Sequence, residues 1–183
     1  MHHIYHTEGI ILRSRNFGED SKYFYIFTRE LGMVIASASG VRKPSSKLRF
    51  ILQDFSYLNF DLVRGRDFWR LTSAGKTGEL ENLTKSFEVY RRISNIGRLL
   101  GRLLPGEEAN PALFDNLVAG FKTLEIAERD HDVKNTEIVI VLKILSGLGY
   151  LAAPEVEDLV EKIKTDERQV LTLINQVLKE THL

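Results

Sequence analysis

Residues 55–74 read FSYLNFDLVRGRDFWRLTSA, with two strand-like runs on either side of a tight turn. Apolar and polar side chains alternate through Leu58-Asn59-Phe60-Asp61-Leu62, which is the period of two that a half-buried β-strand produces. The turn Arg64-Gly65-Arg66-Asp67 contains the small and polar residues of a hairpin, and the second run follows from Phe68 to Ala74. The stretch therefore predicts an antiparallel hairpin whose tip carries two cations, Arg64 and Arg66.

Three further strand-like runs precede the hairpin, at 7–14, 21–28 and 33–39. Apolar side chains on both faces of 21–28 predict contacts on both sides of that strand. The third run contains Ala36 and Ala38, whose small side chains allow another strand to approach closely. Five short strands in about 75 residues, with no helical period among them, predict a closed or partly closed barrel. The five-stranded oligonucleotide-binding (OB) fold is the leading candidate.

A basic segment, which we call the basic loop, reads GVRKPSSKLR over residues 40–49 and connects the third and fourth strands. Pro44 lacks a backbone donor and the two serines favour local turns, so this segment is expected to be an exposed loop. It would present four cations, Arg42, Lys43, Lys47 and Arg49. Such a loop suits the phosphates of a nucleic acid, but its composition equally fits a solubilising surface loop with no ligand.

The second half of the chain has a different period. From residue 84 onward, apolar residues recur every three or four positions, as in amphipathic helices. Helices are expected at 84–104, after Asn110-Pro111, at 137–148, after Pro154, and after the capping residue Asp166. The fold class is therefore α+β, with a five-stranded OB-fold barrel in residues 1–80 followed by an all-α helical domain in residues 81–183.

Charge is distributed unevenly, although the net charge is zero. Residues 1–80 hold 12 Lys and Arg against 8 Asp and Glu, a net charge of +4, whereas residues 81–183 hold 13 against 17, a net charge of −4. This asymmetry favours nucleic acid as a partner for the first half. The absence of cysteine excludes disulfides and thiolate zinc sites. Because no apolar run is long enough to span a bilayer, a cytoplasmic protein without membrane contact is expected.

No catalytic constellation is present in the sequence, which lacks a Gly-rich phosphate loop, a Gly-x-Ser-x-Gly motif and a His-Glu-x-x-His motif. A non-enzymatic protein without a cofactor is therefore expected. His2, His3 and His6 lack further ligands at metal spacing. Asp130-His131-Asp132 reads as a solvated turn between two helices, so we expect no metal site.

Aromatic residues of the first half offer a second kind of contact with nucleic acid. The candidates for base stacking are Tyr23, Tyr25, Phe68 and Trp69. Aromatic residues of a small barrel mostly fill its core, however, so only the less buried of these four remain candidates.

Several short motifs follow one another along the chain in a recognisable order. In the first half they are EGIILR at 8–13, FGE at 17–19, FTRELG at 27–32, GVRK at 40–43, and SKLR at 46–49 followed by Gln53. In the second half they are LLP at 103–105, Asn110-Pro111 with Leu113-Phe114, and LGY at 148–150. Together they resemble the RecO family of bacterial recombination mediators over most of the chain.

The resemblance implies a barrel that binds single- and double-stranded DNA, joined to a helical domain, with no enzymatic active site. Members of that family anneal complementary strands, associate with the RecR protein, and help to replace single-stranded-DNA-binding protein with RecA recombinase. The DNA-binding residues that the resemblance implies here are Arg13, Arg42, Lys43, Lys47 and Arg49. The hairpin cations Arg64 and Arg66 are added because they lie in the same basic half.

A second site is implied on the helical half, because many family members bind there the acidic, apolar-ended tail of single-stranded-DNA-binding protein. The candidates for contacts with its carboxylates are Arg91, Arg98 and Arg102, which lie along one side of the helix expected at 84–104. The same stripe also fits a solvated flank or an extension of a nucleic-acid path.

The chain departs from the family pattern after LGY at 148–150. Many members continue there with a four-cysteine zinc module, whereas this sequence has no cysteine and continues with Ala152-Ala153-Pro154. The residues are also compatible with two other classes of protein. An RNA-binding OB-fold protein would use the same cations, because phosphate contacts do not distinguish the sugar, and a protein-interaction adaptor would agree with the zero net charge.

Overall fold

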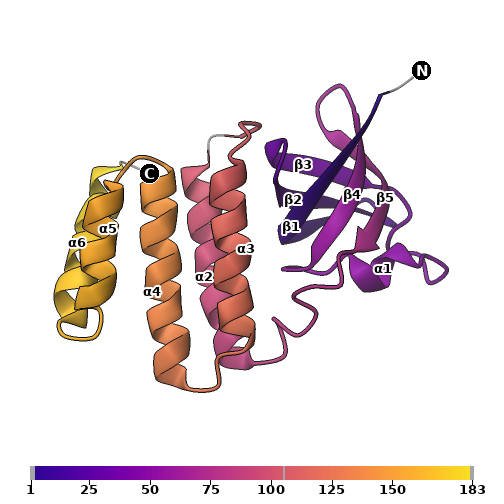
Figure 1. Ribbon diagram of the computed structural model, residues 1–183. Helices are drawn as coiled ribbons and strands as arrows, with labels where there is room; N and C mark the ends of the chain where they lie inside the picture. The colour runs from indigo at the N-terminus through magenta and orange to yellow at the C-terminus, as the bar shows by residue number, and fades with distance from the viewer. Residues whose placement is uncertain (1–2, 105, 182–183) are drawn as a thin grey trace.

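The computed structural model describes residues 3–104 and 106–181. Within them, five strands form a closed barrel in the order β1-β2-β3-β5-β4, as Figure 1 shows. The strands are β1 (Ile4–Phe17), β2 (Ser21–Thr28), β3 (Gly32–Ala38), β4 (Tyr57–Arg64) and β5 (Trp69–Lys76). The five-stranded barrel expected from the sequence is confirmed.

Strand β1 is longer than the sequence predicts because it has two partners. Its first part pairs with β4 from Ile4 to Ile10, and its second part pairs with β2 from Gly9 to Phe17, with a register shift between Ile11 and Arg13. Asn16, a residue type common in turns, is therefore held in the ladder by its pairing with Lys22 of β2.

The barrel closes through a short parallel contact between β3 and β5. Ala36 pairs with Trp69 and Ser37 with Arg70, and the Ser37 hydroxyl donates a hydrogen bond to the Trp69 carbonyl at 3.2 Å. Ala36 is fully buried beside its partner strand. The small side chain thus admits the closing strand, as its sequence predicts.

Six helices complete the described chain. They are α1 (Leu48–Ile51), α2 (Phe87–Leu103), α3 (Pro111–Glu125), α4 (Asp130–Gly147), α5 (Ala153–Lys162) and α6 (Glu167–Glu180). Figure 1 shows α2 and α3 beside the barrel, α4 beyond them, and α5 and α6 farthest from the barrel. Side-chain caps begin three of the helices: Ser86, Asn110 and Asp166 accept from the backbone N–H three residues on.

Two further predicted boundaries differ from the structure. Helix α4 begins at Asp130, so Asp130-His131-Asp132 forms its first turn instead of a hinge between helices. Acidic residues are favourable there because the helix dipole is positive at its N-terminus. The basic loop also ends early, since Arg49 lies in the single helical turn α1. The loop cations are nevertheless exposed as predicted, while Val41 is buried beneath them.

One of the two apolar core clusters is shared by the barrel and the helices. Phe114 of α3 is fully buried, with its ring centroid 5.5 Å from that of Phe27 and 6.0 Å from that of Tyr57. Phe27 thus faces the helices, whereas Phe24 and Ile26 of the same strand fill the barrel interior. Both faces of β2 are therefore contacted, as the sequence predicts. The helices therefore pack directly against the barrel and bury apolar side chains on its outer face.

Candidate nucleic-acid interface

The basic loop is fastened to the turn between β1 and β2. The Arg42 backbone N–H donates to the Asp20 carbonyl at 2.9 Å, and Arg42 Nη1 donates to the carbonyls of Gly18 and Glu19 at 3.2 and 2.7 Å. Lys43 Nζ lies 3.7 Å from the Asp20 carboxylate. Arg42 therefore supports the loop's position with part of its guanidinium, in addition to presenting charge.

Three cations converge beneath this loop. Lys22 of β2, Arg42 of the loop and Arg49 of α1 line a hollow of about 310 Å³, whose other lining residues are Val41 and Leu52. No carboxylate of the described chain belongs to that lining. A concave surface of one charge with an apolar floor concentrates the field on an anion, which suits a phosphate.

Lys22 is a candidate that the sequence pattern does not single out. It reads there as the one charged position of a mainly apolar strand. Its pairing with Ala38, three residues before Val41, brings it next to the base of the basic loop. Its position beside the loop follows from the register in which β2 and β3 pair, and a single sequence does not specify that register.

The remaining loop cations differ in their surroundings. Lys47 is exposed at the residue before α1. The Arg49 guanidinium carbon lies 4.8 Å from the ring centroid of Phe50, a side chain that is 69% exposed. Lys47 and Arg49 thus reach solvent beside the hollow, where a phosphate backbone could approach both.

The two hairpin cations, Arg64 and Arg66, differ in their contacts. Arg64 forms an ion pair with Glu107 of the α2–α3 connection and stacks over Trp69, whose Nε1 donates to the same carboxylate at 3.0 Å. Its charge is therefore matched by a carboxylate. Arg66 is exposed in the hairpin and has no ion pair among the described residues. Trp69 is 4% exposed and fills the barrel, so it offers no face to a base.

Arg13 does not lie at the basic loop. Its guanidinium carbon stands 3.8 Å from the ring centroid of Tyr25, and the residue lines a cleft of about 470 Å³ between β1 and α2. Arg98 and Arg102 of α2 line the same cleft, together with Gly97 and Gly101, whose lack of a side chain leaves room there. The fold thus brings one predicted DNA contact together with two residues predicted to bind a partner.

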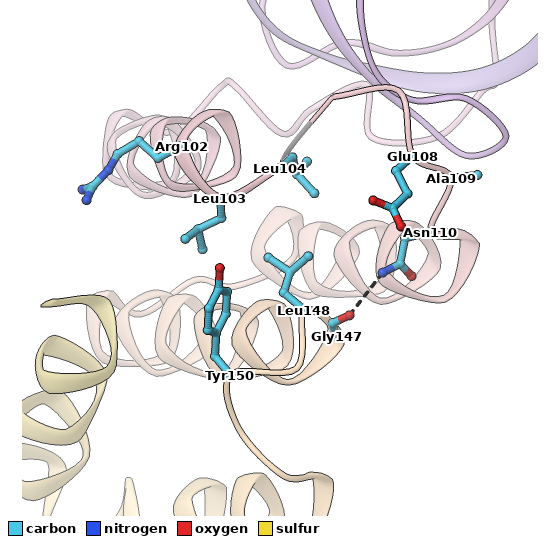
Figure 2. Close-up of a pocket in the computed structure, with 9 residues that line it drawn as sticks. All are labelled: Arg102, Leu103, Leu104, Glu108, Ala109, Asn110, Gly147, Leu148 and Tyr150. Carbon is cyan, nitrogen blue, oxygen red and sulfur yellow. Dashed lines mark hydrogen bonds between the residues drawn. The ribbon is translucent and has the colours of Figure 1, made fainter. Parts of the chain in front are cut away.

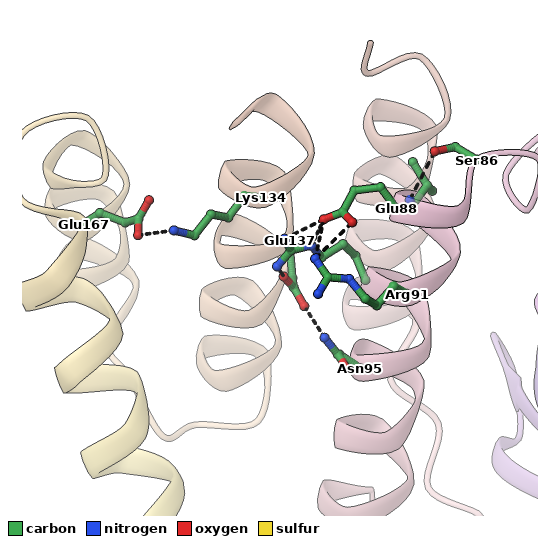
Figure 3. Close-up of polar contacts among 9 residues, drawn as sticks. Ser86, Glu88, Arg91, Asn95, Lys134, Glu137 and Glu167 are labelled. Atoms are coloured by element: carbon green, nitrogen blue, oxygen red, sulfur yellow. Dashed lines mark hydrogen bonds and ion pairs between the residues drawn. The ribbon is translucent and has the colours of Figure 1, made fainter. Parts of the chain in front are cut away.

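Arg91, the third residue of that stripe, is held elsewhere. Its Nη2 donates to both Glu88 oxygens, at 2.7 and 3.0 Å, as Figure 3 shows. Arg92 also binds Glu88, and it reaches Glu137 of α4 at 2.7 Å. Hydrogen bonds from Arg91 and then Arg92 lower the pKa of Glu88. Arg91 thus belongs to the edge of a polar network that joins α2 to α4.

An apolar groove runs between α2, α4 and α6, with a volume of about 420 Å³. Its apolar lining consists of Ile96, Leu99, Ile138, Val141, Leu171, Ile174 and Leu178. Arg98 and Arg102 also line it, so two of the three stripe residues adjoin apolar side chains. This combination can receive a short peptide that has an apolar end and nearby carboxylates.

Metal ligands do not cluster in the part of the chain that the structure describes: no group of three or more His, Cys, Asp or Glu could hold an ion. His6 instead lies 2.6 Å from Asp61, between Nδ1 and Oδ1, and His131 lies 3.0 Å from Asn135. His2 lies outside the described residues. None of the described helices is long and apolar enough to cross a membrane.

Comparison with known proteins agrees with this architecture. The sequence model of the family described as "Recombination protein O N terminal" matches residues 1–77, which cover the whole barrel. Curated proteins named "DNA repair protein RecO" match beyond it. Examples are those of Heliobacterium modesticaldum, 29% identical over 147 residues, Pelotomaculum thermopropionicum, 31% over 147, and Bacillus cereus, 28% over 143.

The barrel therefore matches the N-terminal domain of the RecO family, and the chain is similar to RecO proteins beyond the barrel. The matches cover 80% of the chain for the first two relatives and 78% for the third. They cover 52%, 56% and 56% of the relatives themselves, so the chain spans about half the length of the curated RecO proteins it matches.

The RecO-like motifs of the second half meet around one pocket, shown in Figure 2. Asn110 caps α3 by accepting from the Leu113 N–H at 3.0 Å, and its Nδ2 donates to the Gly147 carbonyl at 3.1 Å. Gly149 has a φ of +82° and follows the last turn of α4, as a C-terminal glycine does. These motifs therefore join the start of α3 to the end of α4. Pro105 of the LLP motif lies outside the described residues.

Proposed function

We propose that this protein is a DNA repair protein that binds DNA through the phosphate backbone and has no catalytic site of its own. The observation that carries the proposal is the convergence of Lys22, Arg42 and Arg49 on one hollow, whose described lining contains no carboxylate, in a barrel of the RecO family. Cations in an exposed concave surface supply sequence-independent affinity for nucleic acid.

In more detail, we propose that the protein is a recombination mediator. It would bind and anneal single strands, associate with a RecR-like protein, and help to load recombinase onto DNA coated with single-stranded-DNA-binding protein. The names of the matched relatives, which are DNA repair proteins, support the coarse part of this proposal. The finer steps rest on resemblance to the family.

We also propose a division of labour between residues 1–80, which contact DNA, and residues 81–183, which contact a protein partner. The apolar groove supports the second part. A tail with acidic residues and a terminal aromatic could insert the ring between Leu99, Val141 and Leu171 and place its carboxylates near Arg98 and Arg102. Arg91 has no part in this contact, because it already binds Glu88.

The experiment that tests the function is a salt series of fluorescence anisotropy with labelled single-stranded DNA, duplex DNA and RNA of equal length. Binding should weaken linearly in log K against log salt, with a slope of about −0.7 for each phosphate neutralised on a single strand. Stronger binding of RNA than of DNA would favour an RNA-binding protein. Absence of salt-dependent binding to all three would contradict the proposal and favour a protein-interaction adaptor.

A further inference from the structure

Three aromatic rings form a continuous cluster on the outside of the barrel. The ring centroids of Phe17 and Tyr23 are 4.6 Å apart, and those of Tyr23 and Phe68 are 4.9 Å apart. Phe17 is 52% exposed and Phe68 is 43% exposed, whereas Tyr23 between them is half-buried. We call these three residues the aromatic platform. Water therefore reaches rings that a protein core would normally enclose.

Each ring comes from a different segment, and local structure explains its position. Phe17 ends β1 just before the turn that Gly18 makes with a φ of +58°. Tyr23 faces outward because its strand neighbour Phe24 faces the barrel core. A Cβ at Gly65 would overlap the Phe68 carbonyl, so only glycine lets the hairpin fold tightly enough to carry Phe68 to Tyr23.

Cations surround this platform. Across the sheet, Tyr23 pairs with Arg15 of β1 and with Ser37 of β3, and Ser37 pairs with Arg70 of β5. Directly paired residues lie on one face, so both arginines flank the platform. Arg15 and Arg70 are exposed and form no ion pair within the described part of the chain.

The basic loop is hydrogen-bonded to the same turn. Arg42 binds the carbonyls of Gly18 and Glu19, the two residues that follow Phe17. Acidic groups nearby are Glu19, Asp20 and Asp67; of these, Asp20 faces Lys43. In five-stranded barrels of the OB type, the connection between the first two strands, the faces of strands two and three, and the connection between the last two strands form the surface that oligonucleotides contact. The platform is built from these parts.

We propose that Phe17, Tyr23 and Phe68 stack against the unpaired bases of single-stranded DNA, with its phosphates directed toward Arg15 and Arg70. This inference rests on the proposed function, because it specifies which form of DNA the barrel binds and by what chemistry. Stacking uses the faces of bases, which are covered by their neighbours in a duplex and exposed in a single strand. The platform therefore confers a preference for single strands, whereas the phosphate contacts alone would not.

The test compares oligothymidine with an abasic chain of equal length, which has the same phosphates and no bases. The wild type should bind oligothymidine about tenfold more tightly or better. The double variant Phe17→Leu, Phe68→Leu keeps the apolar area but removes two aromatic faces, and should bind both chains with the affinity that the wild type shows for the abasic chain. Phe68→Tyr keeps the ring and should leave binding unchanged.

Two controls keep the outcome clear. Phe87→Leu alters a side chain that is 79% exposed on α2, far along the chain from the barrel, and should change neither affinity. A 2-aminopurine base in the oligonucleotide should lose fluorescence on binding the wild type but not the double leucine variant.

Equal affinity of the wild type for oligothymidine and the abasic chain, with salt-dependent binding of both, would overturn the stacking proposal and leave the proposed function standing. Failure to bind either chain or duplex would overturn the proposed function itself. A platform that instead joins two copies of the chain would appear as a wild-type dimer in sedimentation that the leucine variant dissociates, with unchanged DNA binding, and this result also overturns the proposal.

Discussion

Arg29 and Asp115 form a two-pronged ion pair between the barrel and α3, in which Arg29 Nε and Nη2 donate to the two carboxylate oxygens at 2.9 and 3.0 Å. Arg29 follows the last residue of β2, and Asp115 follows the buried Phe114. The pair therefore links the end of β2 to α3 at the point where the apolar side of α3 enters the shared core. Hydrogen bonding from Arg29 lowers the pKa of Asp115.

The stability that this pair contributes should disappear in acid. A carboxylate whose folded-state pKa is lowered stabilises the fold above its ordinary pKa, and the contribution is lost as pH falls through the lowered value. Asp115→Asn should therefore lower the melting temperature by no more than about 4 °C near neutral pH, because exposed ion pairs contribute little. The difference from the wild type should shrink as pH falls below about 4, the ordinary range of an aspartate pKa. Asp67→Asn, at an exposed carboxylate without an ion pair among the described residues, serves as the control. A difference that persists undiminished in acid would contradict this account.

Phe114→Ala should be among the most damaging substitutions. The ring is fully buried and contacts Phe27 and Tyr57, so its removal leaves a cavity between the barrel and the helices. We expect a loss of about 3–5 kcal/mol in the free energy of unfolding, measured by urea denaturation. Phe87→Ala, at a side chain that is 79% exposed, should change it by less than about 0.5 kcal/mol. Similar losses for both variants would mean that the shared core does not form.

Gly32 should not tolerate a side chain. Its φ is +72°, and a Cβ there would overlap the backbone of Glu108, while the neighbouring Met33 N–H donates to the Gly106 carbonyl at 2.8 Å. Gly32→Ala should destabilise the protein by more than about 2 kcal/mol, because strain and overlap add. Gly18→Ala separates the two effects: its φ of +58° is equally left-handed, but nothing lies within 4 Å, so about 1 kcal/mol is expected. Equal losses of stability for Gly32→Ala and Gly18→Ala in thermal melts would show that the α2–α3 connection does not pack closely against Gly32.

Removing charge at the hollow should flatten the salt dependence of DNA binding. The variant Lys22→Gln, Lys47→Gln, Arg49→Gln should reduce the slope of log K against log salt by about 0.7 for each single-strand phosphate that it no longer neutralises. Arg42 is kept, because its guanidinium also holds the loop on the β1–β2 turn. Affinity for all sequences should fall alike, since phosphates carry no sequence information.

The matched control for this triple variant changes three exposed lysines of the helical half to glutamine, namely Lys162, Lys164 and Lys179. It alters the net charge by the same amount but lies on α5, α6 and their connection, farthest from the barrel in Figure 1. Its slope and affinity should equal those of the wild type. If both triple variants weaken DNA binding equally, net charge matters and the hollow is not the binding surface.

A synthetic peptide with acidic residues and a terminal phenylalanine should bind the groove between α2, α4 and α6. Arg98→Gln with Arg102→Gln should weaken its binding about tenfold at low salt, because two charge-assisted contacts are removed. Arg91→Gln changes the same helix but a residue that binds Glu88, and should leave the affinity unchanged. Calorimetry measures the affinity of the wild type and of both variants. If Arg91→Gln weakened peptide binding and the Arg98→Gln, Arg102→Gln variant did not, the peptide contact would have to be assigned to Arg91.

Much of the fold was predictable because its signals are local. Alternation in Leu58-Asn59-Phe60-Asp61-Leu62 and the three-and-four spacing of α2 depend on neighbours within a few residues. Cap residues such as Asn110 act over a single turn, and they begin helices where expected. Errors fell at element ends, as at Asp130, where polar residues fit both a turn and the first turn of a helix.

The grouping of charges at the candidate site was decided by tertiary structure alone. The sequence determined that Arg13, Arg64 and the basic loop are cationic and that the loop is exposed. The register of β2 and β3 determined that Lys22 joins Arg42, and docking of the helices determined that Arg13 faces α2 and that Glu107 neutralises Arg64. Partners such as Arg64 and Glu107 are separated by 43 positions in the chain. Strand register and helix docking bring them together, because burial of the shared apolar core selects one arrangement from many that local preferences allow.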